Sequence, residues 1–247
     1  MPPCVRRFER TIPVHVLARE ADLTRTQREG LGKIETLTLL GVAQETTTRI
    51  PATPATDRRI DAVLFVRASL GNTRALESTA TVVHACFPHP SVLILENARG
   101  DVCLSAALTS RRKRATGFAV NAMEADSDIG SWRRTEQGKA FLSSLAFETL
   151  DQRSLAHLTQ DIMARIRLAR VARLVGFYPD PGLCRTPDVV AVIERLLECQ
   201  GRQDRLRAQW KAHGTTQRER LQLRIHLSEA IDQTKAAVDE LTRRCGR

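Results

Sequence analysis

The spacing of apolar residues changes near residue 150 and divides the chain into two parts. Before that point, short β-branched runs alternate with a few helical stretches and are interrupted by Gly and Pro. From Asp151 onward, apolar residues recur at steps of three and four, which is the spacing of one helix face. We therefore predict an α+β fold, with a mixed sheet, a β-meander and packed helices over residues 1–150 and helices after them.

Short runs rich in Val, Ile, Thr and Leu predict the strands of the sheet. Asn97–Gly100 separates two of these runs, and its Gly can adopt the positive φ that a short hairpin loop needs. We therefore expect the last three runs to pair as an antiparallel meander. The candidate strands are Thr11–Leu17, Thr36–Leu40, Glu45–Ile50, Ile60–Leu70, Ser91–Glu96, Asp101–Leu108 and Thr116–Glu124.

Two helices are predicted between these strands. The first is capped by Asp22 or Thr24 and runs to Lys33. The second covers Arg74–Cys86 and ends before Pro88, because proline has no amide donor to continue a helix. Its buried stripe is expected to consist of Leu76, Ala80, Val83 and Phe87.

The second part predicts three helices. The first covers residues 151–175 and is expected to pack on the α/β domain, and residues 176–187 form a linker with three Pro and two Gly. Residues 188–245 then carry two apolar stretches with coiled-coil spacing, which predict an antiparallel coiled-coil hairpin. We expect its apolar seam, closed within one chain or between two copies in a homodimer, to bind a partner. The seam residues singled out are Leu196, Leu206, Trp210, Leu227, Ile231 and Leu241.

The chain is basic, since its 247 residues contain 38 Lys and Arg against 28 Asp and Glu. Only five of the cations are Lys, so an Arg-rich composition explains the excess as readily as phosphate binding does. The densest run is Arg111, Arg112, Lys113 and Arg114, at the predicted turn before the last strand. We predict nucleic-acid contact there, the alternatives being a solvated loop or an acidic partner protein. With one Tyr and two Trp, this contact is expected to be to the backbone rather than by base stacking.

The sequence lacks the motifs that are typical of membrane proteins, secreted proteins, nucleotide-binding enzymes and serine hydrolases. No apolar run approaches the roughly 18 residues of a membrane helix, and the start of the chain has no signal-peptide pattern. The six Cys are scattered without a CxxC pair, as expected for reduced thiols in the cytoplasm. The GxGxxG, GxxxxGK[ST] and GxSxG patterns are also absent, so we expect no cofactor.

The sequence contains only fragments of the usual metal-binding motifs. The His-x-Cys-x2-His sequence that starts at His84 does not have the spacing of a tetrahedral zinc site, and we expect no metal there. A restriction-type nuclease would hold a metal with carboxylates followed by a Lys. Asp61, Glu96 and Asp101 stand at strand ends, but the Lys is missing.

The string CFPHPSVLIL, residues 86–95, places Pro88-His89-Pro90 directly before an apolar strand. It resembles the Ile-Pro-Tyr-Pro motif and the following apolar strand of a bacterial family catalogued as domain of unknown function 4391, and the resemblance extends along nearly the whole chain. A charged coiled-coil segment at the end is similar as well. The other matching motifs are Ile12-Pro13, Ile50-Pro51, Ser131-Trp132 and the helix around Phe141–Leu145. The chain departs from the family pattern in two places: the Lys expected after the first Ile-Pro is absent, where Val14 and His15 stand, and His89 replaces the Tyr.

The resemblance implies a genomic context rather than an active site. Members look like small accessory genes beside helicases and DNA methyltransferases in restriction-like antiviral clusters. Our leading hypothesis is a non-catalytic accessory subunit of a DNA-targeting complex, docked on such an enzyme through the coiled coil, with DNA contact from the α/β domain. The alternatives are a divergent metal-dependent nuclease and a stand-alone, non-specific DNA-binding module.

Overall fold

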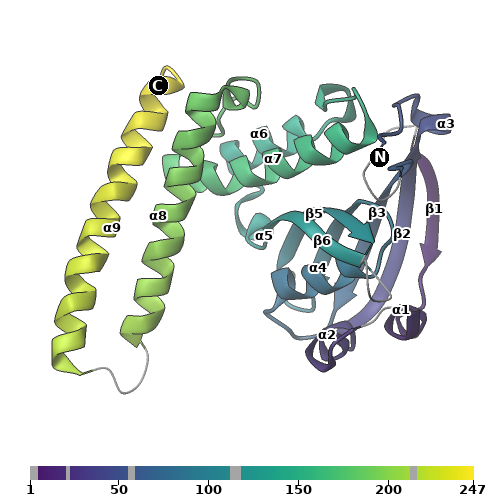
Figure 1. Cartoon of the computed structure of the whole chain (residues 1–247), viewed down its shortest axis with the longest axis horizontal. Helices are drawn as coiled ribbons and strands as arrows, with labels where there is room; N and C mark the ends of the chain where they lie inside the picture. The colour runs from purple at the N-terminus through teal and green to yellow at the C-terminus, as the bar shows by residue number, and fades with distance from the viewer. Residues whose placement is uncertain (1–4, 21–22, 55–58, 112–117, 212–215) are drawn as a thin grey trace. The chain divides into compact units, whose positions relative to one another are not determined.

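The computed structural model describes residues 5–20, 23–54, 59–111, 118–211 and 216–247. It divides into two compact units, Met1–Ala169 and Arg170–Arg247. The first contains a mixed six-stranded sheet with packed helices, and the second contains a pair of long helices (Figure 1). The predicted α+β class is therefore confirmed.

The strands of the sheet follow one another in sequence order across it. β3 and β4 are parallel, and all other neighbours are antiparallel. The expected meander is therefore present in β4 to β6, with Gly100 at φ 80° in its first turn. The strands are β1 Arg6–Thr11, β2 Ile34–Gln44, β3 Ala62–Leu70, β4 Ser91–Asn97, β5 Val102–Arg111 and β6 Phe118–Asp126.

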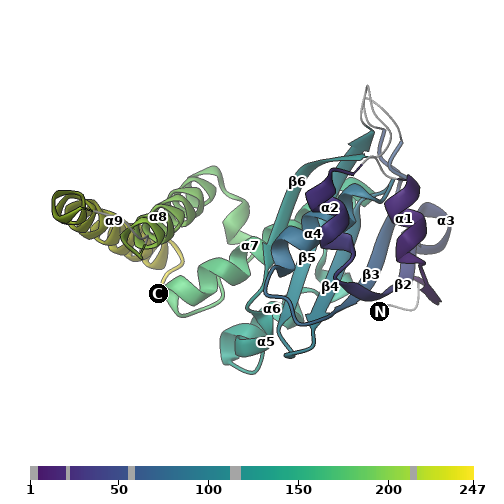
Figure 2. The same cartoon turned by 90° about the horizontal axis from the view of Figure 1, so that it is seen from below.

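Helices α1, α2 and α4 lie on one face of the sheet (Figure 2). The main core forms there, because Val66, Leu93 and Leu95 point from the central strands toward α4. All four predicted stripe residues of α4 are buried. The helices of this unit are α1 Val14–Glu20, α2 Arg25–Leu31, α3 Glu45–Thr48, α4 Leu76–Ala85, α5 Ile129–Trp132, α6 Glu136–Ser144, η1 Phe147–Thr149 and most of α7 Leu155–Val175.

The expected strand over Thr11–Leu17 is wrong. β1 ends at Thr11, and the amide of Ile12 makes a last hydrogen bond of 2.7 Å to the carbonyl of Leu37. Pro13 explains the change, because proline cannot donate to a strand ladder while its fixed φ suits the first turn of a helix. Its carbonyl accepts from the amide of Val16, and α1 follows.

The expected strand over Glu45–Ile50 is also wrong, since Glu45–Thr48 is the short helix α3. The hydroxyls of Thr47 and Thr48 donate to the carbonyl of Gln44 at 3.2 and 2.8 Å. Such local hydrogen bonds offer the backbone an alternative to a strand ladder. Arg49 then ends the turn with a left-handed φ of 61°.

A buried ion pair holds residues 144–151 in place. This segment covers part of the sheet face opposite to α1, α2 and α4. Arg165 pairs with Asp161 at 2.8 Å and donates to the carbonyls of Ser144 and Thr149. Asp161 in turn accepts from the amide of Asp151 at 3.0 Å. The segment between residues 144 and 151 is thereby held over an apolar cavity of about 330 Å³, whose floor includes Phe65, Val92 and Leu104 of the sheet.

The second unit contains the short η2 Leu183–Arg185 and the helices α8 Pro187–Lys211 and α9 Gln217–Arg244. α8 and α9 lie side by side and antiparallel (Figure 1). Thr216 caps α9 in the described structure by accepting from the amide of Glu219, whose side chain bonds back to Thr216. Within the ranges given above, no helix is both long and apolar enough to span a membrane.

His84 is a fully buried polar link between α4 and the sheet. Its Nδ1 lies 2.7 Å from the hydroxyl of Ser91, and its Nε2 lies 2.9 Å from that of Ser105. Ser105 donates its own proton to the carbonyl of Glu124, so its oxygen is free to accept from Nε2–H. One neutral tautomer therefore satisfies every group. Burial lowers the pKa of His84 to about 3.

This low pKa predicts that the first unit loses stability in mild acid. The unfolded chain binds the proton near pH 6.5 and the folded chain only near pH 3, so the free energy of unfolding falls as pH decreases between these values. From pH 7 to pH 5, wild-type chain is expected to lose about 2 kcal/mol more than the His84→Gln variant. Urea unfolding followed by Trp132 fluorescence, in a Trp210→Phe background, measures this difference. Equal losses in the two chains would contradict it.

Candidate functional site

The second unit is held together by a buried seam between α8 and α9, in which two of the three fully buried α9 residues are alanines. On α9, Ala230, Ala237 and Leu241 are buried completely or nearly so, while Ile231 and Val238 are half-buried. Small residues let two helices approach closely. On α8, the buried residues are Val189, Val192, Ile193, Leu196, Cys199 and Gln203.

Gln203 is the polar member of this seam, with only 4% of its surface exposed. Its amide nitrogen donates to the carbonyl of Ala230 at 3.2 Å and to the hydroxyl of Thr234 at 2.5 Å. Its carbonyl oxygen accepts from Arg207 at 3.2 Å. A satisfied polar group at a core position favours one register over others, because any shift would leave it without partners.

Burial along the seam decreases toward the loop that joins the two helices. We call residues 202–211 and 216–227 the closed end and residues 187–201 and 228–247 the open end. Leu206 and Leu223 at the closed end are only half-buried, and Trp210 is 39% exposed. The two helices are therefore tightly packed at the open end, far from the loop. They are loosely packed at the closed end, next to the loop.

Charge is distributed just as unevenly. The open end carries seven carboxylates and five cations, and several of them are paired. Arg195 pairs with Glu240, and Arg244 pairs with Glu240 at 3.0 Å and with Asp188 at 3.6 Å. Charge at the open end is thus largely compensated within the unit.

The closed end carries seven cations and only two carboxylates. Asp204 pairs with Arg207 at 3.5 Å, and Glu219 serves the cap of α9. The remaining side chains form no ion pair with any residue that the structure describes. These are Arg202, Arg205, Lys211, Arg218, Arg220 and Arg224.

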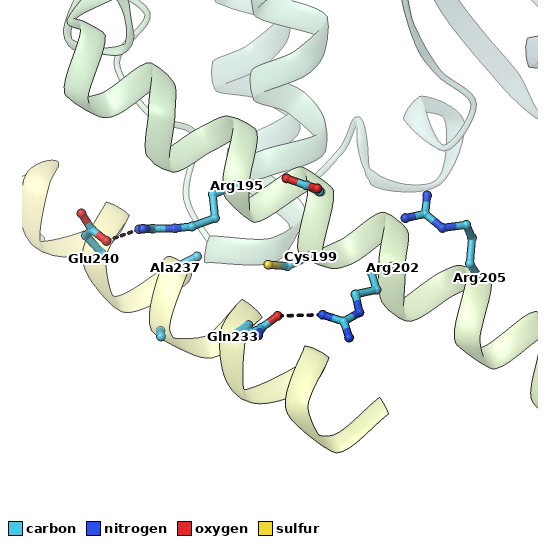
Figure 3. Close-up of a pocket in the computed structure, with 9 residues that line it drawn as sticks. Arg195, Cys199, Arg202, Arg205, Gln233, Ala237 and Glu240 are labelled. Atoms are coloured by element: carbon cyan, nitrogen blue, oxygen red, sulfur yellow. Dashed lines mark hydrogen bonds and ion pairs between the residues drawn. The ribbon is translucent and has the colours of Figure 1, made fainter. Parts of the chain in front are cut away.

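A hollow of about 530 Å³ lies along α8 and α9 and is lined by Arg195, Arg202 and Arg205 opposite Gln233 and Ala237 (Figure 3). Arg195 and Arg202 are engaged there with Glu240 and Gln233, whereas Arg205 has no such partner among the residues drawn.

The second hollow, of about 340 Å³, lies at the closed end, and we call it the Trp210 pocket. Trp210 and Leu227 supply its apolar part, and three cations surround them: Arg207 and Lys211 of α8 and Arg224 of α9. Two of these cations, Lys211 and Arg224, are among those without a counter-charge in the described chain.

A further apolar feature lies on α9. Leu221 is 62% exposed and Ile225 is 53% exposed, and their spacing of four places them on one helix face. We call these two residues the α9 ridge. Ile225 and Leu227 are two residues apart, so roughly 200° of helix rotation separates the ridge from the Trp210 pocket.

The structure distributes the predicted partner-binding residues between these features. Leu196 and Leu241 are fully buried in the seam and hold the helices together. Leu206 and Ile231 are half-buried beside it, and Trp210 and Leu227 line the pocket.

The predicted nucleic-acid contact cannot be placed in the same way. Arg112, Lys113 and Arg114 lie outside the described residues, and Arg111 is described only as the last backbone position of β5. That contact therefore stays a prediction.

The three carboxylates considered for a nuclease are not brought together in one site: Glu96 and Asp101 lie at the same end of the sheet, but Asp61 lies at the other end. Asp61 precedes β3, whereas Glu96 pairs with Ser69 near the other end of that strand, roughly 26 Å away at the rise of a β-strand. Glu96 is paired with Arg67 at 2.7 Å, and Asp101 accepts from Asn97 at 2.9 Å. Across the described ranges, no group of three or more His, Cys, Asp or Glu is placed to hold a metal ion.

Residues 3–233 match the model of the family described as Domain of unknown function (DUF4391). The chain belongs to this family. The DUF4391 match extends through the sheet, α7, α8 and the first part of α9, and so it includes the closed end and the Trp210 pocket. No curated protein and no solved structure matches the chain.

Sequence reasoning on this DUF4391 chain missed the α9 ridge. It identified Arg207 and Arg224 as cations of the hairpin but not their convergence on one pocket. Leu221 and Ile225 lie off the apolar spacing that was read as the seam, and that offset was the available signal. The sequence predicted Trp210 and Leu227 as seam residues. They line one pocket with Arg224 only because the two helices pair in antiparallel fashion.

The role of Gln203 in the register can be tested with Gln203→Leu. We expect this variant to slow hydrogen exchange in α8 and α9 about fivefold, because an apolar side chain in the seam stabilises the pair by about 1 kcal/mol. We also expect it to form dimers or shifted pairings in sedimentation experiments, since the register is no longer specified. Gln200→Leu, outside the seam, is the matched control. Faster exchange in Gln203→Leu than in the control would contradict the prediction.

Proposed function

We propose that this chain is a non-catalytic accessory subunit of a bacterial DNA-targeting complex of the restriction-like, antiphage type. In this proposal α8 and α9 act as a coiled-coil hairpin that docks the chain on the helicase or DNA methyltransferase of the complex. The closed end of the same hairpin contacts the DNA backbone. The gene context that the family resemblance implies is consistent with this arrangement.

The observation that carries the proposal is the α9 ridge within the cation-rich closed end. Leu221 and Ile225 are large apolar side chains that the unit leaves more than half exposed. Because slightly more than half of each side chain is exposed, burying the pair against another protein is favourable by about 1–2 kcal/mol per side chain. The surrounding unpaired cations favour a partner whose surface is acidic around an apolar centre.

The same cations support DNA contact beside the docked partner. Like charges gathered without counter-charges repel one another and destabilise the free chain. Contact with phosphates removes that repulsion and releases the counterions of the nucleic acid. The binding is therefore expected to be led by the backbone and to weaken steeply with salt.

A stand-alone DNA-binding module would also account for the cations. It would not account for the ridge, which faces away from the Trp210 pocket and offers no charge to a phosphate. The nuclease alternative receives less support, because the strand register separates Asp61 from Glu96. The accessory-subunit proposal accounts for both the α9 ridge and the unpaired cations of the closed end.

The docking can be tested by co-purification from the source bacterium with a tagged chain. We expect Leu221→Asp with Ile225→Asp to lower recovery of the helicase or methyltransferase at least tenfold, because both apolar contacts become charged. The matched control is Gln217→Asp with Gln222→Asp, which adds the same charge within the first two turns of α9 and keeps the ridge. Nuclease treatment of the lysate should leave wild-type recovery unchanged.

Two results would contradict the proposed docking. One is equal recovery with the ridge variant and the control variant. The other is loss of the partner after nuclease treatment, which would mean that nucleic acid alone connects the two proteins.

A further inference from the structure

We infer that the Trp210 pocket is a subsite for one nucleotide of a single-stranded nucleic acid. The base lies against Trp210 and Leu227, and the neighbouring phosphates contact Arg207, Lys211 and Arg224. This inference differs from the sequence-based expectation of contact to the backbone without base stacking, because the structure leaves Trp210 39% exposed beside these cations. This inference rests on the DNA contact in the proposed function, and it adds the kind of strand and the residues that bind it.

The pocket arises where the tight seam ends. Gln203 and Ala230 are the last well-buried pair before the loop, and beyond them Leu206, Leu223 and Leu227 are only half-buried. The bulky Trp210 stands in the last turn of α8, where it is 39% exposed. The helices therefore leave a hollow of about 340 Å³ with an aromatic side chain at its wall. This volume lies at the lower end of the range for small-molecule sites.

The charges around the hollow select a polyanion. Arg207 is shared with Asp204 and Gln203, but Lys211 and Arg224 have no counter-charge within the described ranges. Arg binds a phosphate through two parallel hydrogen bonds, and Lys adds a point charge. Cations from two different helices thus converge on one small apolar floor.

The combination of one aromatic side chain with several cations favours a nucleotide over an acidic helix. A docked amphipathic helix needs a row of apolar anchors at successive turns, whereas this pocket offers a single apolar floor made by two side chains. A flat base can cover that floor while its phosphates reach the rim. Stacking on an aromatic side chain together with backbone contacts is the usual mode of single-strand binding.

The hollow also favours an unpaired strand over a duplex. A base in a duplex is stacked between its neighbours, and it must leave the stack before it can enter a concave site. In a single strand that cost is small. The pocket therefore distinguishes a single strand from a duplex by whether the base is accessible. We expect no preference for one base over another.

The subsite can be tested by fluorescence anisotropy of the full chain with a labelled oligothymidylate of about twelve nucleotides and with a duplex of equal length. We expect Trp210→Leu to weaken binding of the single strand about tenfold, because it keeps an apolar side chain but removes the stacking surface. Trp210→Phe should recover most of that loss. Arg224→Gln should lower the slope of log affinity against log salt by about 0.7.

The matched control is Lys235→Gln, which removes one exposed cation from the same helix outside the closed end. It should change the affinity less than twofold, and circular dichroism should show equal helix content in all variants. Equal weakening by Trp210→Leu and Lys235→Gln would overturn the subsite, as would tighter binding of the duplex. Displacement of the oligonucleotide by a polyglutamate peptide of equal charge would overturn it in favour of an acidic protein partner.

The outcomes also separate this inference from the proposed function. If the wild-type chain binds no oligonucleotide at low salt, both the subsite and the DNA contact of the proposed function fail. If it binds but the pocket variants behave like the control, only the subsite fails. Docking through the α9 ridge is tested independently by co-purification.

Discussion

The close contact of α8 with α9 through small side chains determines what the second unit can present to other molecules. Ala230 and Ala237 fill the α9 side of the seam, and Gln203 fixes the register through hydrogen bonds to Ala230 and Thr234. With this seam occupied by small groups, larger apolar residues of α9 such as Leu221 and Ile225 remain outside it. The pairing also brings Trp210 and Arg224, from different helices, to one pocket. The interaction surfaces are thus consequences of the packing.

The first unit uses its buried polar residues for structure. His84 links α4 to two strands as a neutral ring, and Asp161 with Arg165 holds the segment between residues 144 and 151. Both are satisfied by hydrogen bonds, which is the condition for burying polar or charged groups without a large cost. The closed end of the helix pair differs in carrying six cations without a counter-charge among the described residues on one short stretch of two helices, where binding can make use of them.

Local signals in the sequence were sufficient for much of the fold. The stripe of α4, the cap at Thr24, the Gly100 turn and the meander follow from spacing and turn chemistry over a few residues. The two wrongly predicted strands lie where a local feature outweighed β propensity. Pro13 does so before α1, and the threonine hydroxyls do so in α3. On α9 the seam lies one residue away from the more apolar Ile231, on Ala230, because close helix contact favours small side chains. The pocket was beyond local reasoning, since Trp210 and Leu227 are brought together only by the turn between the helices.

The central claim is that the closed end of α8 and α9 contacts nucleic acid. Ultraviolet cross-linking of the full chain to single-stranded DNA, followed by mass spectrometry of the cross-linked peptides, tests it most directly. The account predicts that the cross-linked nucleotide is found on peptides from residues 206–227, with Trp210 as the main site. Cross-links confined to the run from Arg111 to Arg114, or to other parts of the first unit, would contradict it.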